Sequence, residues 1–142
     1  MKIVRYEEKY RDDMVFMVLQ AKDALGRVPR INRDLLDVQS CYLDEGTEFL
    51  LAIDDNYRVI GCVGYERMDF RTAKLHRFYV KASLKRRGIG SALLKQIESS
   101  IANAGYSEIV AHLGGTEYAE ARAFYPAKGY VEYMPNWMRK II

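Results

Sequence analysis

Residues 85–91 read Lys85-Arg86-Arg87-Gly88-Ile89-Gly90-Ser91 and lie between an expected strand (74–80) and an expected amphipathic helix (88–104). Glycine has no Cβ, so the backbone here can turn sharply and approach a ligand closely. The free N–H groups of a helix's first turn, together with the positive end of the helix dipole, favour an anion. The stretch therefore predicts a strand-to-helix turn that can bind a pyrophosphate, with Ser91 and the basic side chains adding donors and charge.

Two familiar phosphate-binding motifs do not fit this turn. A dinucleotide-binding fingerprint requires a third glycine where Leu93 stands, and a P-loop requires a Gly-Lys-Ser/Thr ending that is absent. A tight turn with solvated lysines and arginines, and no ligand at all, stays open on this motif alone.

The pattern on either side of the turn alternates between helical and strand periodicity. Apolar residues recur every four positions from Ile89 to Ile101, and Gly105 follows as a stop signal. The first third of the chain is expected to be helical, and several strands follow it. The other expected helices cover 8–25, 32–46 (with Asn32 as N-cap) and 117–128, and the other expected strands cover 48–53, 58–67 and 108–113, with one or two closing strands in 130–142. This order predicts one α/β or α+β domain over residues 1–142, a sheet with helices on its faces.

Composition narrows the class of protein. Hydrophobic residues make up 49% and charged residues 29%, which is typical of a globular domain. No apolar run approaches the ~20 residues that span a bilayer, and the charged N-terminus lacks the apolar region of a signal peptide. We therefore expect a cytoplasmic protein with no membrane partner. The net charge of +3 is too mild to predict a nucleic-acid partner, and the two cysteines and two histidines lack metal-ligand spacing, so no metal is expected.

Two motifs, in order, resemble those of the GNAT family of N-acetyltransferases. Residues 85–90 are similar to the family's Gln/Arg-x-x-Gly-x-Gly/Ala segment, with Lys85 in the first place, and residues 121–130 are similar to its Ala-x-x-hydrophobic-Tyr-x-x-x-Gly-Phe/Tyr segment. The resemblance, which covers residues 75–130, implies a mixed, mostly antiparallel central sheet flanked by about four helices. It also implies acetyl-CoA as the acyl donor and an amine, on a small molecule or a protein, as the acceptor. The residues implied to hold the cofactor are Phe78, Tyr79, Val80, Lys85, Arg86, Arg87, Gly88, Gly90 and Ser91.

The resemblance assigns Tyr125 as the general acid. In the family, a neutral amine attacks the thioester directly, and a tyrosine hydroxyl donates a proton to the departing thiolate. A phenol with a pKa of ~10 stays protonated where a thiol of ~8.5 leaves. The strand 78–80 is implied to align the pantetheine and to direct a backbone N–H at the thioester oxygen. It is also implied to carry a bulge and to separate from the strand 109–113.

The general base is left open by the sequence. The glutamate that some members of the family carry on the central strand has no counterpart here, so His76, Glu66, His112 and an ordered water remain candidates. Strict alternation would place His76 on the same side of the strand as Phe78 and Val80, which favours a buried structural histidine over a catalytic one.

Two other positions depart from the family's pattern. Tyr118 stands where the family often has asparagine, and Pro126 follows Tyr125 inside an expected helix, at a cost of ~3 kcal/mol unless the helix breaks there. The loop 25–33 carries three arginines, which would suit an acceptor bearing a carboxylate or phosphate, although a solvated loop is the favoured interpretation.

The leading hypothesis is thus an amine acetyltransferase, and the alternative is a non-catalytic acyl-CoA-binding module. Nucleic-acid binding through the basic run lacks supporting aromatic spacing. The sequence leaves the oligomeric state open, a homodimer included.

Overall fold

The computed structural model describes residues 1–114 and 119–142, which form a mixed sheet with helices on both faces. The strand order within the described residues is β1-β2-β3-β4-β5-β7-β6, and every neighbouring pair is antiparallel except β4–β5. The expected mixed, mostly antiparallel sheet is confirmed. The strands are β1 Lys2–Arg5, β2 Phe49–Ile53, β3 Val59–Arg67, β4 Thr72–Val80, β5 Glu108–His112, β6 Val131–Met134 and β7 Trp137–Ile141.

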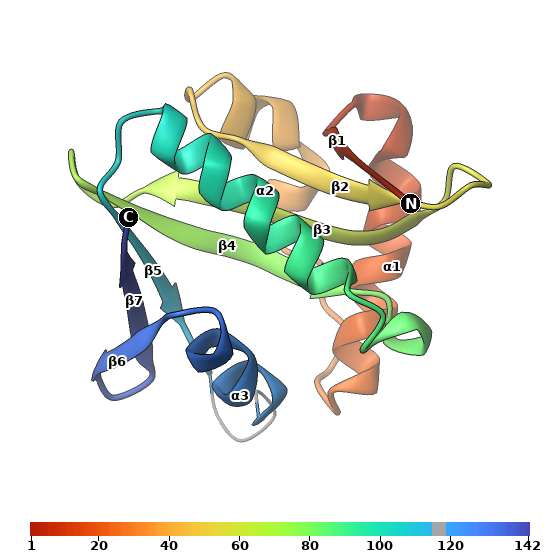
Figure 1. The fold of residues 1–142 in the computed structure, drawn as a ribbon. Coiled ribbons are helices and arrows are strands. Elements are labelled where there is room, and N and C mark those ends of the chain that lie inside the picture. The colour runs from red at the N-terminus through yellow and green to blue at the C-terminus, as the bar shows by residue number, and fades with distance from the viewer. Residues whose placement is uncertain (115–118) are drawn as a thin grey trace.

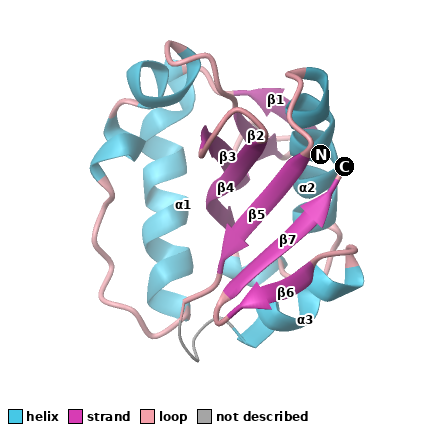
Figure 2. Ribbon diagram, turned by 90° about the vertical axis from the view of Figure 1, so that its left-hand side faces the viewer, coloured by secondary structure: helices cyan, strands magenta, loops and turns pink. Residues whose placement is uncertain are grey.

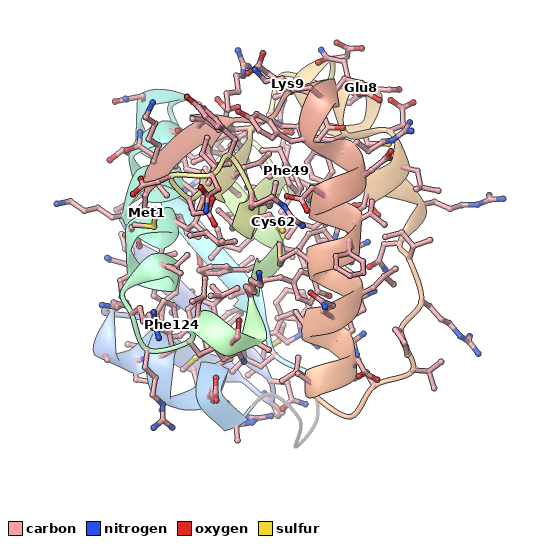
Figure 3. All side chains as sticks on the ribbon, turned by 90° about the vertical axis from the view of Figure 1, so that its right-hand side faces the viewer. Met1, Glu8, Lys9, Phe49, Cys62 and Phe124 are labelled. Carbon is pink, nitrogen blue, oxygen red and sulfur yellow. The ribbon has the colours of Figure 1, made fainter. Side chains whose placement is uncertain are left out.

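Helices cover the two faces of this sheet (Figures 1 and 2). One apolar core lies between the sheet and α1 (Arg11–Ala24), and the other lies between the sheet and α2 (Ile89–Asn103), with α3 (Ala119–Ala127) packed into the second. Phe49 and Cys62 belong to the first core and lie beside α1 (Figure 3). The short helices are η1 Glu8–Tyr10, η2 Arg33–Leu36, η3 Gln39–Leu43 and η4 Ala82–Leu84. No helix in the described ranges has the length and apolar character needed to cross a membrane.

Two expectations for the first third of the chain were wrong. Residues 2–5 form the edge strand β1, paired with β2, which the sequence analysis did not predict. The expected helix over 32–46 is divided into the 3-10 helix η2 and the π-helix η3, because Asp37 between them has a non-helical backbone (φ −148°, ψ 65°). Asn32 makes no side-chain cap; instead, its Oδ1 accepts a hydrogen bond of 2.6 Å from the buried Lys22.

A bulge interrupts the central strand β4. The register with β3 shifts where Cys62 pairs with Tyr79 but Gly64 pairs with His76, so β4 carries one extra residue there. Arg77, in the shifted stretch, has a positive φ of 54°. The expected bulge is therefore present.

The bulge changes which way the β4 side chains face. His76 and Arg77, although consecutive, both bond to groups on the α1 side, whereas Phe78 and Val80 pack into the core on the α2 side. The prediction that His76 shares a face with Phe78 and Val80 was wrong, because strict alternation does not survive an extra residue.

The strands β4 and β5 pair over only three residues before they separate. Thr72, Ala73 and Lys74 pair with Glu108, Ile109 and Val110, and no further pairs are recorded between the two strands in the described residues. Beyond this short seam the block of β5, β7 and β6 turns away from β4 (Figure 1). The expected separation of the two strands is present and opens a wedge in the sheet.

Candidate active site

A cavity of about 830 Å³ occupies the wedge between β4 and β5. This volume is typical of a small-molecule or cofactor site. Its walls come from β4 between Lys74 and Val80, from the turn leading into α2, from the end of β5 and from α3, and Ala21 and Leu25 of the α1 region also line it. Segments far apart in the sequence thus meet around one opening.

The glycine turn forms the wall on the α2 side. Gly88 precedes the helix with a φ of 82°, a left-handed conformation that suits glycine, and its carbonyl accepts the first helical hydrogen bond, from the amide of Ala92 (3.0 Å). The amides of Ile89, Gly90 and Ser91 therefore lie in the first turn, where a helix offers no internal acceptor. All three residues line the cavity, so these donors are available to an anion placed there.

The basic residues of this turn differ in position. Lys85 and Arg86 line the cavity together with Gly88, Gly90 and Ser91, but Arg87 is not among the described residues of its wall. The Lys85 ammonium is paired with the Glu120 carboxylate on α3 at 3.0 Å. Because both partners line the cavity, this ion pair joins the glycine turn to α3 within its wall.

Tyr125 lies on α3 in the opposite wall. Its side chain is buried, with only 6% exposed, and its ring packs edge-on against Phe78 of β4, Phe124 and Tyr130. Burial raises the pKa of the Tyr125 phenol above its ordinary value, so the hydroxyl keeps its proton at neutral pH. Tyr125 is one of the residues that line the cavity.

Pro126 is accommodated in the last turn of α3. The helix runs through the proline and ends one residue later, at Ala127. The Tyr125 carbonyl then accepts hydrogen bonds from the amides of Lys128 (2.9 Å) and Tyr130 (3.1 Å), which closes the helix at Gly129, a residue with positive φ. Tyr118, where an asparagine was expected by resemblance, lies outside the described residues.

The strand β4 supplies the floor of the cavity. Phe78, Tyr79 and Val80 all line it; Phe78 and Val80 face the α2 side and Tyr79 packs on the α1 side. Phe78 lies within the register shift of the bulge, so the regular ladder with β3 is interrupted beside the opening.

The candidate bases lie on the α1 side of the sheet. His76 and His112 both line the cavity, but the His112 ring packs against Trp137 with centroids 4.7 Å apart. Glu66 is not among the described lining residues, and its Oε1 lies 3.7 Å from the Lys74 ammonium and 3.9 Å from Nε2 of His76.

A buried polar group behind His76 was missed in the sequence. Nδ1 of His76 lies 2.8 Å from the Tyr42 hydroxyl, which in turn lies 2.5 Å from Oδ2 of Asp34. Arg77 donates two hydrogen bonds to the same carboxylate (2.9 and 3.0 Å). Burial opposes ionisation of Asp34, but the bonds from Arg77 and Tyr42 outweigh it and keep the pKa of this carboxyl below its ordinary value. No local motif marks these residues, because the bulge brings them together.

The three arginines of the loop 25–33 are not among the residues that line the cavity. Arg30 and Arg33 are exposed, and Arg27 is half-buried. The loop is held to α1 by Lys22, whose ammonium donates to the Arg30 carbonyl at 2.6 Å. Of this loop, Leu25 is the residue that reaches the cavity.

Comparisons with known proteins agree with this geometry. The family model described as the acetyltransferase (GNAT) family matches residues 11–130. Human N-acetyltransferase 8 is 28% identical over 102 residues, which cover 68% of this chain and 44% of that protein, so the chain spans less than half of this relative's length.

Solved structures share the fold across nearly the whole chain. A GNAT-family acetyltransferase from Staphylococcus aureus Mu50 has a TM-score of 0.87 at 20% identity, covering 99% of this chain and 98% of its own. The PaiA N-acetyltransferase of Thermoplasma acidophilum, solved in complex with coenzyme A, has a TM-score of 0.80 at 18% identity, with 99% and 98% covered. Together with the family match over most of the chain, the wedge-shaped cavity and the glycine turn lead to one conclusion: this chain belongs to the acetyltransferase (GNAT) family.

Proposed function

We propose that the protein is an N-acetyltransferase that moves an acetyl group from acetyl-CoA to a primary amine. The observation that carries the proposal is that one cavity is lined both by the unpaired first-turn amides of α2 and by Tyr125 of α3. A pyrophosphate at one wall and a thioester near the other would fit a single extended cofactor. The Thermoplasma relative, which was solved with coenzyme A, supports this choice of ligand.

In the proposed complex the diphosphate of acetyl-CoA accepts hydrogen bonds from the amides of Ile89, Gly90 and Ser91, and Arg86 adds positive charge. Arg87, which is not in the described wall, contributes less. The ammonium of Lys85 is engaged by Glu120 and would have to exchange partners to reach a phosphate. The pantetheine lies along Phe78, Tyr79 and Val80.

The chemistry follows from the position of Tyr125. The nitrogen of a neutral amine attacks the thioester carbon, the C–N bond forms, and the nitrogen gives up one proton to a base or to solvent. The tetrahedral intermediate then expels the CoA thiolate as the C–S bond breaks. The Tyr125 hydroxyl donates its proton to that sulfur, and the phenolate is reprotonated from solvent. The acceptor is a primary amine on a small molecule or on a protein.

Two measurements on the same preparation test this function. Calorimetric titration with acetyl-CoA and with CoA measures binding, and thiol release across a panel of primary amines measures transfer. Binding of both acetyl-CoA and CoA, together with thiol release that depends on the amine, supports the proposal. Binding without release for any amine would instead favour a non-catalytic acyl-CoA-binding module, and the absence of binding would exclude both.

A further inference from the structure

A chain of three side chains crosses the α1 side of the sheet and ends at the wall of the cavity. It runs from Asp34 on η2 through Tyr42 on η3 to His76 on β4, with contacts of 2.5 Å and 2.8 Å. Tyr42 is only 2% exposed, and the Asp34 side chain is 19% exposed. Because these side chains are shielded from water, each of their protons has few alternative acceptors. The direction of each hydrogen bond in the chain is therefore well defined.

The positions of the protons follow from counting donors. Asp34 is ionised, so it can only accept, and a contact of 2.5 Å between its oxygen and the Tyr42 oxygen requires the phenolic hydrogen to lie between them. That hydrogen is then unavailable to His76. The 2.8 Å contact between the Tyr42 oxygen and Nδ1 of His76 must therefore be donated by Nδ1–H. In the neutral ring the lone pair is left on Nε2.

His76 bonds to Tyr42 through Nδ1, and the other ring nitrogen, Nε2, faces other residues. Its nearest recorded partner among the described residues is Oε1 of Glu66 at 3.9 Å, beyond hydrogen-bonding range, and a carboxylate could not donate to it. His76 is part of the cavity wall, with 21% of its side chain exposed. Nε2, which carries the lone pair of the neutral ring, thus makes no hydrogen bond to the described residues.

The bulge in β4 is what makes this arrangement. With regular alternation, His76 and Arg77 would lie on opposite faces of the sheet; with the extra residue both reach the α1 side. Arg77 adopts a strained positive φ of 54° and binds Asp34 through two nitrogens, which keeps the carboxylate ionised and aimed at Tyr42. Bulges that redirect a side chain are common beside active sites.

We infer that His76 is the general base of the proposed transfer, accepting the amine proton at Nε2, and that Tyr42 and Asp34 are positioning residues that hold its Nδ1 proton. The inference rests on the proposed function. As the amine nitrogen bonds to the thioester carbon, its proton passes to Nε2, and the imidazolium is stabilised through Tyr42 by the Asp34 carboxylate. His76 later returns the proton to solvent.

The charged groups around His76 set its protonation state before the reaction. Arg77 and Lys74 on β4 oppose a positive ring, while Glu66 on β3 and Asp34 on η2 favour it. Burial is the largest influence, and with Arg77 it lowers the pKa of His76 below its ordinary value of 6.5. The ring is therefore neutral at pH 7, the state that a base requires.

The first test is the tautomer itself, which needs no acceptor. Two-bond nitrogen–proton NMR correlation on protein labelled with ¹⁵N-histidine distinguishes a protonated Nδ1 from a protonated Nε2, and the His112→Gln variant identifies which signals belong to His76. We expect Nδ1–H in the wild type and a mixture of tautomers in Tyr42→Phe. A wild-type ring protonated on Nε2 at pH 7.5 would overturn the positioning role of Tyr42 and Asp34.

The second test is kinetic, with spermidine, tryptamine and a lysine-containing peptide as probe amines. We expect His76→Gln to lower kcat by at least about a hundredfold, the usual worth of a general base. We also expect it to remove the part of the acid-side fall in kcat/KM that protonation of His76 should cause in the wild type. Tyr42→Phe should lower kcat by about tenfold, the worth of one buried hydrogen bond to a charged group.

Tyr6→Phe is the matched control, since the Tyr6 hydroxyl also bonds a carboxylate, that of Glu8 (3.3 Å), but outside the cavity. We expect its kcat to be unchanged. Full activity of folded His76→Gln overturns the base assignment. Failure of the wild type to transfer acetyl to any probe, with acetyl-CoA bound or not, instead overturns the proposed function and the base with it.

Discussion

The ring of Phe78 on β4 meets the ring of Tyr125 on α3 nearly at right angles, with centroids 6.5 Å apart, across the wedge where β4 and β5 separate. The Tyr125 ring also packs against the rings of Phe124 and Tyr130. Phenylalanine at this position would make the same ring contacts. The hydroxyl can therefore be removed without disturbing the wall.

The Tyr125→Phe variant tests the proposed general acid, because it removes the hydroxyl and keeps the ring. We expect turnover to fall at least tenfold, because a positioned general acid contributes about 10²- to 10⁴-fold. The dissociation constant of acetyl-CoA, measured by calorimetry, should stay within about twofold, since the ring remains in place. Tyr133→Phe, on β6 and outside the described cavity wall, is the control and should keep full turnover. Unchanged turnover in Tyr125→Phe would remove this residue from the mechanism.

Arg86 and Arg87 are neighbours of equal charge in unequal positions. Arg86 lines the cavity and Arg87 is not in its described wall, so the two alanine variants separate local contact from overall charge. Arg86→Ala should weaken acetyl-CoA binding about three- to tenfold, as an exposed charge-assisted hydrogen bond would predict. Arg87→Ala should change it less than about twofold at 0.15 M salt, because distant charges are screened. Equal losses in the two variants would contradict the placement of the diphosphate.

Gly64 on β3 leaves room for the ring of Phe49 on the paired strand. A Cβ at Gly64 would lie 2.5 Å from Phe49 Cδ2 and 3.2 Å from Tyr42 Cε1, and the Phe49 ring is fully buried between Tyr6 and Tyr42. Gly64→Ala should therefore lower the free energy of unfolding by about 1–3 kcal/mol in urea denaturation. Adding Phe49→Leu should recover part of that loss by vacating space. A Gly64→Ala variant as stable as the parent would mean that Phe49 can move aside.

Asp13 joins α1 to the start of β3 and makes stability depend on pH. Its carboxylate accepts hydrogen bonds from the Arg58 guanidinium (2.8–3.1 Å) and from the Val59 amide (2.7 Å). These bonds, that of Arg58 first, hold the pKa of Asp13 below its ordinary value of 3.8 against the opposing effect of burial. The contribution to stability is thus complete well above pH 3.8 and is lost as the pH falls through the lowered pKa.

Urea unfolding of the Asp13→Asn variant tests this. At pH 7 the variant should be less stable than the wild type by about 1–2 kcal/mol, and the difference should shrink toward pH 2–3 as the wild-type carboxylate is protonated. Asp12→Asn is the matched control, because Asp12 is almost fully exposed and pairs only with its neighbour Arg11 among the described residues. A gap for Asp13→Asn that stays constant with pH would contradict the linkage.

The sequence predicted those elements of the fold that depend on short stretches of residues. The four-residue repeat from Ile89 to Ile101 and the glycines beside it determine α2 and its turn locally, so both appear as expected. The edge strand β1 was not predicted because Ile3 and Val4 are only two apolar residues between charged ones, and their pairing with β2 is a long-range event. The break at Asp37 similarly carries no breaker residue that a pattern would register.

The residues of the candidate site also fall into two groups, those that local motifs predict and those that depend on long-range contacts. Gly88, Gly90 and Tyr125 lie in motifs that can be read directly, and all three line the cavity. The relation between Asp34, Tyr42 and His76 spans up to 42 residues and depends on one extra residue in β4, which reversed the expected facing of every side chain after it. Alternation alone could not locate that residue, because nothing around Arg77 is glycine or proline.

The three-residue seam between β4 and β5 divides the sheet at one point along the chain. Residues before β5 build β1 to β4, α1 and α2, and residues from β5 onward build β5, α3, β6 and β7. During synthesis the glycine turn that we propose to bind the diphosphate is therefore made before the residues of β5 and α3 that face it. A cofactor that spans the wedge would then contact both parts and hold the last-made quarter of the protein against the three quarters that precede it.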